Sequence, residues 1–209
     1  GAVDIVGGTP WLFVRDGLVG TFDHLVVDEA GQLSLANVVA IARSADNLVL
    51  VGDPQQLAQP SKGSHPPGAE ASALEHLLDG AATIPPERGL FLETSWRMHP
   101  QVCSYVSELS YDGRLRSVDD CVRQHVHGDD RLAGSGLRWL AVDHIDNRTR
   151  SAEEAGVVAT LFDQLLGRTW TNRDGEEAEL TMDDLLVVAP YNAQVHALSE
   201  VLPDGARVG

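Results

Sequence analysis

Two carboxylates directly behind an apolar run have the spacing that phosphoryl-transfer chemistry needs. Asp28 and Glu29 follow the run 22–27 with no residue between. The first can hold Mg²⁺ through a water shell, and the second can orient and deprotonate an attacking water. Read alone, an Asp-Glu pair is also typical of the acidic first turn of a helix, where the helix dipole favours negative charge.

A second polar group follows the next apolar run. Gly52 and Asp53 come directly after residues 47–51, and Gln56 lies three residues further along. A glycine lets the backbone approach a ligand closely. A glutamine can hydrogen-bond a terminal phosphate without adding charge. A polar β-turn is the alternative for this segment alone, but two such groups behind neighbouring strands together indicate a phosphate site.

Arg97 is a third candidate for phosphate chemistry. Its guanidinium is always charged and meets phosphate oxygens as a planar fork. The alternative is an ion pair on the protein surface.

The elements that must position the first two groups form a β-α-β unit. The runs 22–27 and 47–51 read as strands, and residues 34–45 repeat apolar side chains at helical spacing behind a capping residue, Ser34. Short links between these elements favour a parallel strand pair and an α/β fold. Because the carboxyl ends of parallel strands carry the site in such folds, both polar groups are expected at one edge.

Further elements are predicted along the chain. A capping box, in which Ser151 and Glu154 satisfy each other's open amides, should begin one helix. The other predictions are helices over 70–78, 100–109 and 193–201, strands over 90–93, 137–142 and 185–189, a strand that opens at Val208, and loops over 58–70 and 80–89.

Composition excludes several classes of protein. The chain has 209 residues, 43% hydrophobic and 22% charged, which is ordinary for a globular protein. The net charge of −16 repels nucleic acid and membranes at long range, although a local basic groove is compatible with it. Two cysteines make no disulfide framework, and no apolar run spans a membrane. We therefore expect a cytoplasmic protein without a membrane partner.

Four motifs in this order resemble superfamily 1 helicases. They are VVDEAGQ, LVLVGDPQQL, LETSWRMHP and VVAPYNAQV, and the resemblance runs from about Val3 to Gly209. It is strongest to the branch that contains the nonsense-mediated-decay RNA helicase and bacterial helicases joined to a RecB-like nuclease domain. The resemblance implies RecA-like P-loop NTPase lobes with parallel sheets, ATP and Mg²⁺ as cofactors, single-stranded DNA or RNA as partner, and a fused or partner nuclease domain.

Site roles follow from this resemblance residue by residue. Asp28 matches the Walker B aspartate that holds Mg²⁺, and Glu29 matches the catalytic glutamate. Gln56 matches the glutamine of the third helicase motif, and Arg97 matches the arginine finger. The resemblance places Gly52, Asp53, Trp96 and Tyr191 at the nucleotide, and Thr9, Trp11, Asn192 and Gln194 at the nucleic acid.

The glycine-rich phosphate loop of a P-loop ATPase is missing from the sequence. The chain has one lysine, Lys62, and the glycines around it do not have the required spacing. We therefore expect an internal helicase fragment that is inactive alone. Residues 1–86 would be the back part of the first lobe, and residues 87–209 the front part of the second. The alternative is a catalytically inactive module that kept the helicase fold and binds nucleic acid or protein.

Overall fold

A parallel strand pair is the centre of the first unit of the protein. The computed structural model describes residues 4–56 and 71–209, and it divides into two units. In the first, β1 (Phe22–Val27) and β2 (Ala45–Leu50) run parallel, with Val27 opposite Leu50. The helix α2 (Leu35–Ala42) connects them. The strand–helix–strand prediction is confirmed in both its order and its parallel direction.

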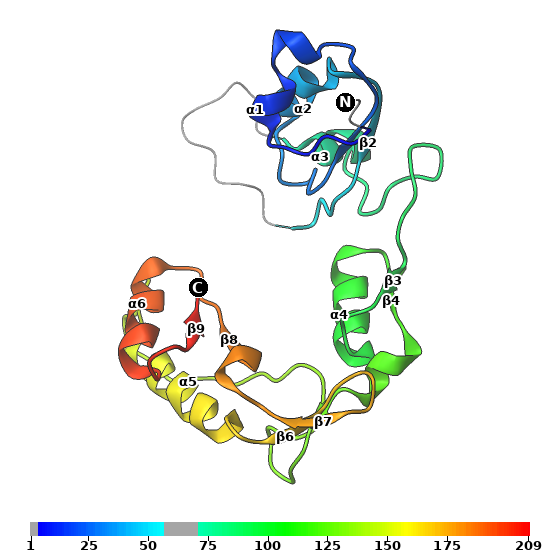
Figure 1. The fold of residues 1–209 in the computed structure, drawn as a ribbon. Helices are drawn as coiled ribbons and strands as arrows, with labels where there is room; N and C mark the ends of the chain where they lie inside the picture. The colour runs from blue at the N-terminus through cyan, green and yellow to red at the C-terminus, as the bar shows by residue number, and fades with distance from the viewer. Residues whose placement is uncertain (1–3, 57–70) are drawn as a thin grey trace. The chain divides into compact units, whose positions relative to one another are not determined.

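Three helices cover this strand pair (Figure 1). They are α1 (Pro10–Phe13), α2, and α3 (Ala73–Leu78), with the 3₁₀ helix η1 (Asp16–Leu18) between α1 and β1. Ser34 caps α2 as predicted, because its hydroxyl accepts a hydrogen bond from the amide of Asn37 at 3.3 Å. The core between strands and helices contains Phe13, Leu25, Val27, Ala30 and Ile41.

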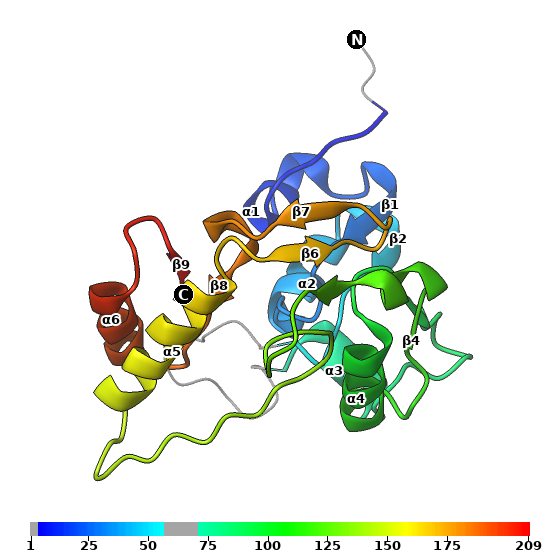
Figure 2. The ribbon, with the colours of Figure 1, turned by 90° about the horizontal axis from the view of Figure 1, so that it is seen from below.

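The second unit contains a helix pair beside a short parallel sheet. The helices α5 (Ala152–Leu165) and α6 (Asn192–Val201) pack against each other, and both views show them side by side (Figures 1 and 2). The strands β8 (Leu186–Val187) and β9 (Arg207–Val208) run parallel next to them. Their common core contains Ala155, Phe162, Ala197, Leu198 and Leu202.

The remaining elements of the second unit form two further strand groups. Parallel strands β3 (Thr94–Ser95) and β4 (Arg116–Ser117) lie on either side of α4 (Pro100–Ser110) in the chain. The antiparallel group contains β5 (His125–Val126), β6 (Thr169–Thr171) and β7 (Glu177–Glu179), and the 3₁₀ helices are η2 (Asp119–Arg123) and η3 (Met182–Asp184).

The α/β class with parallel pairs is confirmed, but two predicted strands were wrong. Residues 90–93 and 137–142 contain no strand. Leu90 and Trp139 are 90% and 93% exposed, so neither segment has the buried face that its apolar residues suggested. A strand needs a neighbour to satisfy its backbone groups. The segment 90–93 meets one only at its end, where the Glu93 carbonyl accepts the Arg116 amide at 2.7 Å just before β3 begins, and residues 137–142 have none among the described residues.

Half of the predicted capping box forms. The hydroxyl of Ser151 accepts a hydrogen bond from the amide of Glu154 at 3.1 Å, as expected. The Ser151 amide instead donates to the side-chain oxygen of Gln194 at 2.6 Å, so the reciprocal bond from Glu154 is replaced by a contact from α6.

Two further predictions concern the segment around Lys62 and a membrane-spanning run. The predicted loop 58–70, with Lys62, lies outside the described residues, and α3 begins at Ala73 rather than at residue 70. In the described part of the chain, no helix is both long and apolar enough to cross a bilayer.

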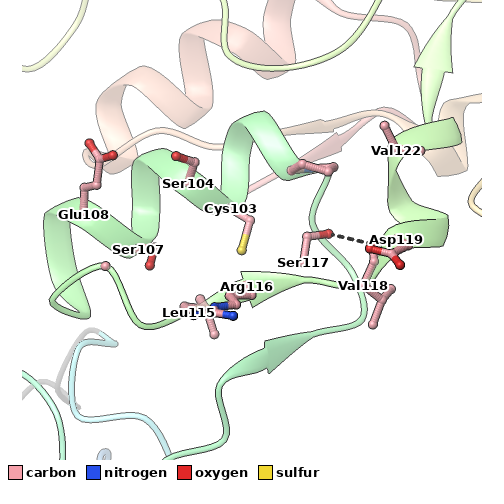
Figure 3. A pocket seen from close by; sticks show the side chains of 12 residues that line it. Cys103, Ser104, Ser107, Glu108, Leu115, Arg116, Ser117, Val118, Asp119 and Val122 are labelled. Atoms are coloured by element: carbon pink, nitrogen blue, oxygen red, sulfur yellow. Dashed lines mark hydrogen bonds between the residues drawn. The ribbon is translucent and has the colours of Figure 1, made fainter.

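A hollow of about 520 Å³ lies beside α4 (Figure 3). Cys103 and Ser107 point from the helix toward the segment that carries Leu115 and Arg116. Ser107 is 2% exposed, and its hydroxyl has no hydrogen-bond partner among the described residues. A buried hydroxyl without a partner loses its hydrogen bonds to water, and no hydrogen bond within the protein replaces them.

Replacing that hydroxyl should therefore stabilise the protein. We expect Ser107→Ala to raise the free energy of unfolding by about 1 kcal/mol. The control is Ser44→Ala, which removes a buried hydroxyl that donates to the carbonyl of Ile41 at 2.8 Å and should cost about 1 kcal/mol. Urea unfolding of both variants measures the difference. Equal destabilisation by the two substitutions would contradict this account of Ser107.

Candidate functional site

The chain segments that leave β1 and β2 are bonded to each other through their backbones. The amide of Val51 donates to the carbonyl of Val27 at 2.8 Å, and the amide of Ala30 donates to the carbonyl of Val51 at 2.9 Å. The parallel ladder thus continues past the last strand residues. We call residues 28–32 the first loop and residues 52–56 the second loop, and these bonds hold both loops at one edge.

Two glycines allow the loops to approach this closely. A Cβ atom on Gly52 would lie 2.7 Å from the backbone nitrogen of Ala30, and one on Gly31 would overlap the backbone carbonyl oxygen of Asp53. Neither backbone group can move away without breaking the contact between the loops. A close backbone approach was predicted for Gly52, but no such role was predicted for Gly31.

The carboxylates of the first loop face solvent. Asp28 and Glu29 are both exposed, and one oxygen of Asp28 accepts a hydrogen bond from the Glu29 amide at 2.9 Å. Glu29 has a φ of +52°, a left-handed conformation that is uncommon for a residue other than glycine. The turn at Glu29 is stabilised by a bond from the Gln32 amide to its carbonyl at 2.9 Å.

The second loop brings Gln56 to the first. The side-chain amide of Gln32 donates to the side-chain oxygen of Gln56 at 3.4 Å. Asp53 orders its own loop, because one of its carboxylate oxygens accepts the amide of Gln55 at 3.0 Å. The structure therefore gathers five predicted residues at one edge: Asp28, Glu29, Gly52, Asp53 and Gln56.

One contact to this edge could not be predicted from local pattern. The chain returns to the first unit at Ser110–Asp112, where the hydroxyl of Tyr111 donates to the second carboxylate oxygen of Asp53 at 2.6 Å. The two residues are 58 positions apart. No motif or periodicity relates them.

Arg97 lies in the second unit on a loop ordered by Ser95. The Ser95 hydroxyl accepts the amides of Arg97 at 3.4 Å and of Met98 at 3.3 Å. Arg97 is exposed, and no ion pair forms at its guanidinium within the described residues. Trp96 beside it is 66% exposed, and its carbonyl accepts a bond from Arg173 at 2.8 Å. Both side chains are free to meet a ligand.

Gln194, which the resemblance places at the nucleic acid, is buried between two helices of the second unit. It is 8% exposed, and its amide binds the backbone of Ser151 in both directions. The Gln194 oxygen accepts the Ser151 amide at 2.6 Å, and its nitrogen donates to the Ser151 carbonyl at 3.1 Å. Gln194 therefore joins the start of α5 to α6.

A shallow hollow of about 170 Å³ surrounds this junction. Its lining includes Tyr191, Gln194, Arg148 and Arg150. Tyr191 is 52% exposed, and Arg150 pairs with Glu200 at 2.8 Å. Asn192, the first residue of α6, is exposed beside them.

The residues expected at a strand of nucleic acid in the first unit are also exposed. Trp11 is 82% exposed on α1, and Thr9 precedes that helix without using its hydroxyl as a cap. A bare indole surface of this kind suits stacking on a base.

The carboxylates fit a magnesium ion that is shared with a ligand. In the described ranges, no group of three or more His, Cys, Asp or Glu residues could hold a metal by itself. Mg²⁺ usually keeps several waters and is bound by one or two carboxylates together with substrate phosphates. Asp28, exposed and with one oxygen not bonded to the Glu29 amide, suits that mode.

Comparison with known families decides the identity of the fold. Residues 69–207 match a model described as an AAA domain, and residues 7–59 match a second model with the same description. The chain belongs to the AAA-domain family of superfamily 1 helicases. The resemblance that the four motifs indicated is thereby confirmed.

Known members of this helicase branch are similar to most of the chain. It is 28% identical to DNA-binding protein SMUBP-2 of Rattus norvegicus, 26% to 3'-5' exoribonuclease HELZ2 of Mus musculus and 25% to helicase sen1 of Schizosaccharomyces pombe. The matches cover 87%, 86% and 85% of this chain, respectively. They cover 19%, 6% and 10% of the relatives, so the chain spans a small part of their length.

The close approach of the two loops gives a direct test. We expect Gly31→Ala to lower the free energy of unfolding by about 1–3 kcal/mol, because the new methyl group overlaps the Asp53 carbonyl. Gly17→Ala is the matched control, since no atom of the described residues lies within 4 Å of its added Cβ, and it should change stability by less than about 0.5 kcal/mol. Urea unfolding measures both. Equal stability of the two variants would show that the loops are not packed as described.

Proposed function

We propose that this chain carries part of the ATP-hydrolysing machinery of a DNA or RNA helicase. The observation that supports the proposal most is the docking of the two loops, which places Asp28, Glu29 and Gln56 at one edge. In this proposal residues 1–86 belong to a first RecA-like lobe and residues 87–209 to a second. The cofactors are ATP and Mg²⁺.

Asp28 would hold Mg²⁺ together with the phosphates of ATP. When bound, the ion supplies positive charge that offsets the negative charge of the phosphoryl oxygens. The Asp28 oxygen that receives the Glu29 amide is already oriented. The other oxygen is left for the ion or for one of its waters.

Glu29 and Gln56 would act on the nucleophile and the terminal phosphate. The left-handed turn at Glu29 directs an exposed carboxylate from the end of β1, where it can orient and deprotonate a water. Gln56 donates from its side-chain nitrogen while its oxygen is engaged by Gln32. Because this donor carries no charge, it can hydrogen-bond the γ-phosphate weakly enough that the product phosphate is still released.

Arg97 would stabilise the transition state from the second unit. Its guanidinium is exposed and forms no ion pair with the residues that the structure describes, which supports this role over the alternative of a surface ion pair. Trp96 and Tyr191 would contact the nucleotide through their exposed rings.

The nucleic-acid partner would be single-stranded DNA or RNA. Trp11 and Thr9 are exposed for contact with it in the first unit, and Asn192 is exposed in the second. Gln194 would act indirectly, by fixing the backbone of Ser151 beside the hollow lined by Arg148 and Arg150. The similarity to 3'-5' exoribonuclease HELZ2 of Mus musculus supports an accompanying nuclease domain.

The 209-residue chain alone should not turn over ATP. The motif G-x-x-x-x-G-K-[ST] does not occur in it, and its one lysine, Lys62, is not part of such a motif. Without those amides and that lysine, the β- and γ-phosphates lose their main cradle. A steady-state phosphate-release assay should match the buffer blank. Steady turnover that Glu29→Gln abolishes would contradict this expectation.

In the full-length protein that contains this chain, Arg97→Ala should lower kcat by about 10³-fold or more and leave nucleotide affinity within a few-fold. The reason is that an arginine finger meets charge that develops only in the transition state. Arg97→Lys should restore little, because an ammonium has no planar fork. The effect is measured as the steady-state rate of phosphate release from ATP in the presence of nucleic acid.

The control for that series is Arg131→Ala, which removes another exposed arginine of the second unit. Its turnover should stay close to that of the wild type. Normal turnover in Arg97→Ala would remove Arg97 from the proposal. A wild-type protein that binds nucleic acid but never hydrolyses ATP would instead favour the inactive binding module.

A further inference from the structure

Tyr111 contacts the proposed nucleotide edge from a distant part of the chain. Its hydroxyl donates to the Asp53 carboxylate at 2.6 Å, which is short enough for a charge-assisted hydrogen bond. The ring of Tyr111 also packs against Phe91, with ring centroids 5.9 Å apart and the planes tilted by 34°. The phenol is therefore held at both its ring and its oxygen.

The phenol keeps its proton over the whole physiological range. Burial raises the pKa of Tyr111 above its usual value, and the hydrogen bond to Asp53 and the charge of that carboxylate raise it further. A group that stays protonated remains a donor at every working pH. The donor side of the bond to Asp53 is therefore constant over that range.

Asp53 is fixed at both of its carboxylate oxygens. One accepts the hydroxyl of Tyr111, and the other accepts the amide of Gln55 at 3.0 Å. The backbone carbonyl of the same residue lies against Gly31 of the first loop, with no room for a Cβ between them. Any displacement of Asp53 would therefore disturb the packing of the second loop against the first.

The position of Gln56 depends on the same contact between Asp53 and Gly31. The amide of Gln56 lies 3.4 Å from the carbonyl oxygen of Asp53, to which it donates, and its side-chain oxygen meets Gln32 of the first loop. The bond between the two glutamine side chains is long and exposed, so it cannot hold the loop by itself. The anchored carboxylate of Asp53 is the stronger restraint.

We propose that Tyr111 is a positioning residue for ATP hydrolysis. Its hydroxyl fixes Asp53 and thereby keeps Gln56 in a constant position relative to Glu29. This inference rests on the proposed function, because it assigns Gln56 and Glu29 to the γ-phosphate and the attacking water. Tyr111 itself touches neither of them, and its contribution is to the geometry of the second loop.

The test replaces only the oxygen. Tyr111→Phe keeps the ring against Phe91 and removes the donor to Asp53. Tyr105→Phe is the matched control, since Tyr105 is 56% exposed and lies on α4. Both variants are made in the full-length protein, and both are also made in an Asp53→Ala background. ATP turnover, equilibrium affinity for ADP and thermal unfolding are measured for each.

We expect Tyr111→Phe to lower kcat about tenfold, the loss that corresponds to one hydrogen bond to a charged group. Affinity for ADP should stay within about twofold, because ADP lacks the phosphate that Gln56 would meet. In the Asp53→Ala background, Tyr111→Phe should lower kcat no further, since its partner is already absent. Tyr105→Phe should match its parent in both backgrounds.

Three results would overturn the inference, and one of them also concerns the proposed function. Wild-type kcat in Tyr111→Phe removes the positioning role and leaves the proposed function intact. A loss of turnover with an equal loss of ADP affinity and a lower unfolding temperature assigns Tyr111 to general stability. Absence of ATP turnover in the wild-type protein overturns the proposed function and this inference together.

Discussion

The rest of the candidate site depends on the backbone contact between the loops that follow β1 and β2. The Ala30 amide binds the Val51 carbonyl at 2.9 Å, directly behind the two carboxylates. Ala30 is fully buried, so the first loop is anchored immediately after its charged residues. Gly31 then fits against Asp53 only because it has no side chain. Without this contact the carboxylates and Gln56 would belong to two independent surface loops.

The fold meets that constraint with few elements. The helix α2 makes the strands parallel, so that both chain segments leave the sheet at the same edge. Phe13 and Ile41 pack from two helices onto the strand residues Leu25 and Val27, which supports the edge from below. In the second unit, the loop with Arg97 is ordered by the Ser95 hydroxyl and ends where α4 begins.

The sequence pattern predicted those elements that depend on interactions between residues close together in the chain. The β-α-β unit, the Ser34 cap and the presence of strands near residues 185–189 and at Val208 follow from apolar runs and turn residues near each other in the chain. Residues 137–142 have strand composition but no neighbouring strand in the described part of the chain, which no local pattern can reveal. The β6 and β7 hairpin was missed because Glu177 and Glu179 flank a single small apolar residue, Ala178, although Asp174-Gly175 is a hairpin signal. The Tyr111 contact joins residues too distant for any motif.

The most direct test of the central claim is a structure of the full-length protein with Mg²⁺ and a non-hydrolysable ATP analogue. We expect the metal at Asp28, bound directly or through one water, with the γ-phosphate facing Glu29 and Gln56. Gly31 and Asp53 should remain in contact beneath it. The account would be contradicted by a nucleotide bound at another surface, with the two loops separated and solvent between Asp28 and Gln56.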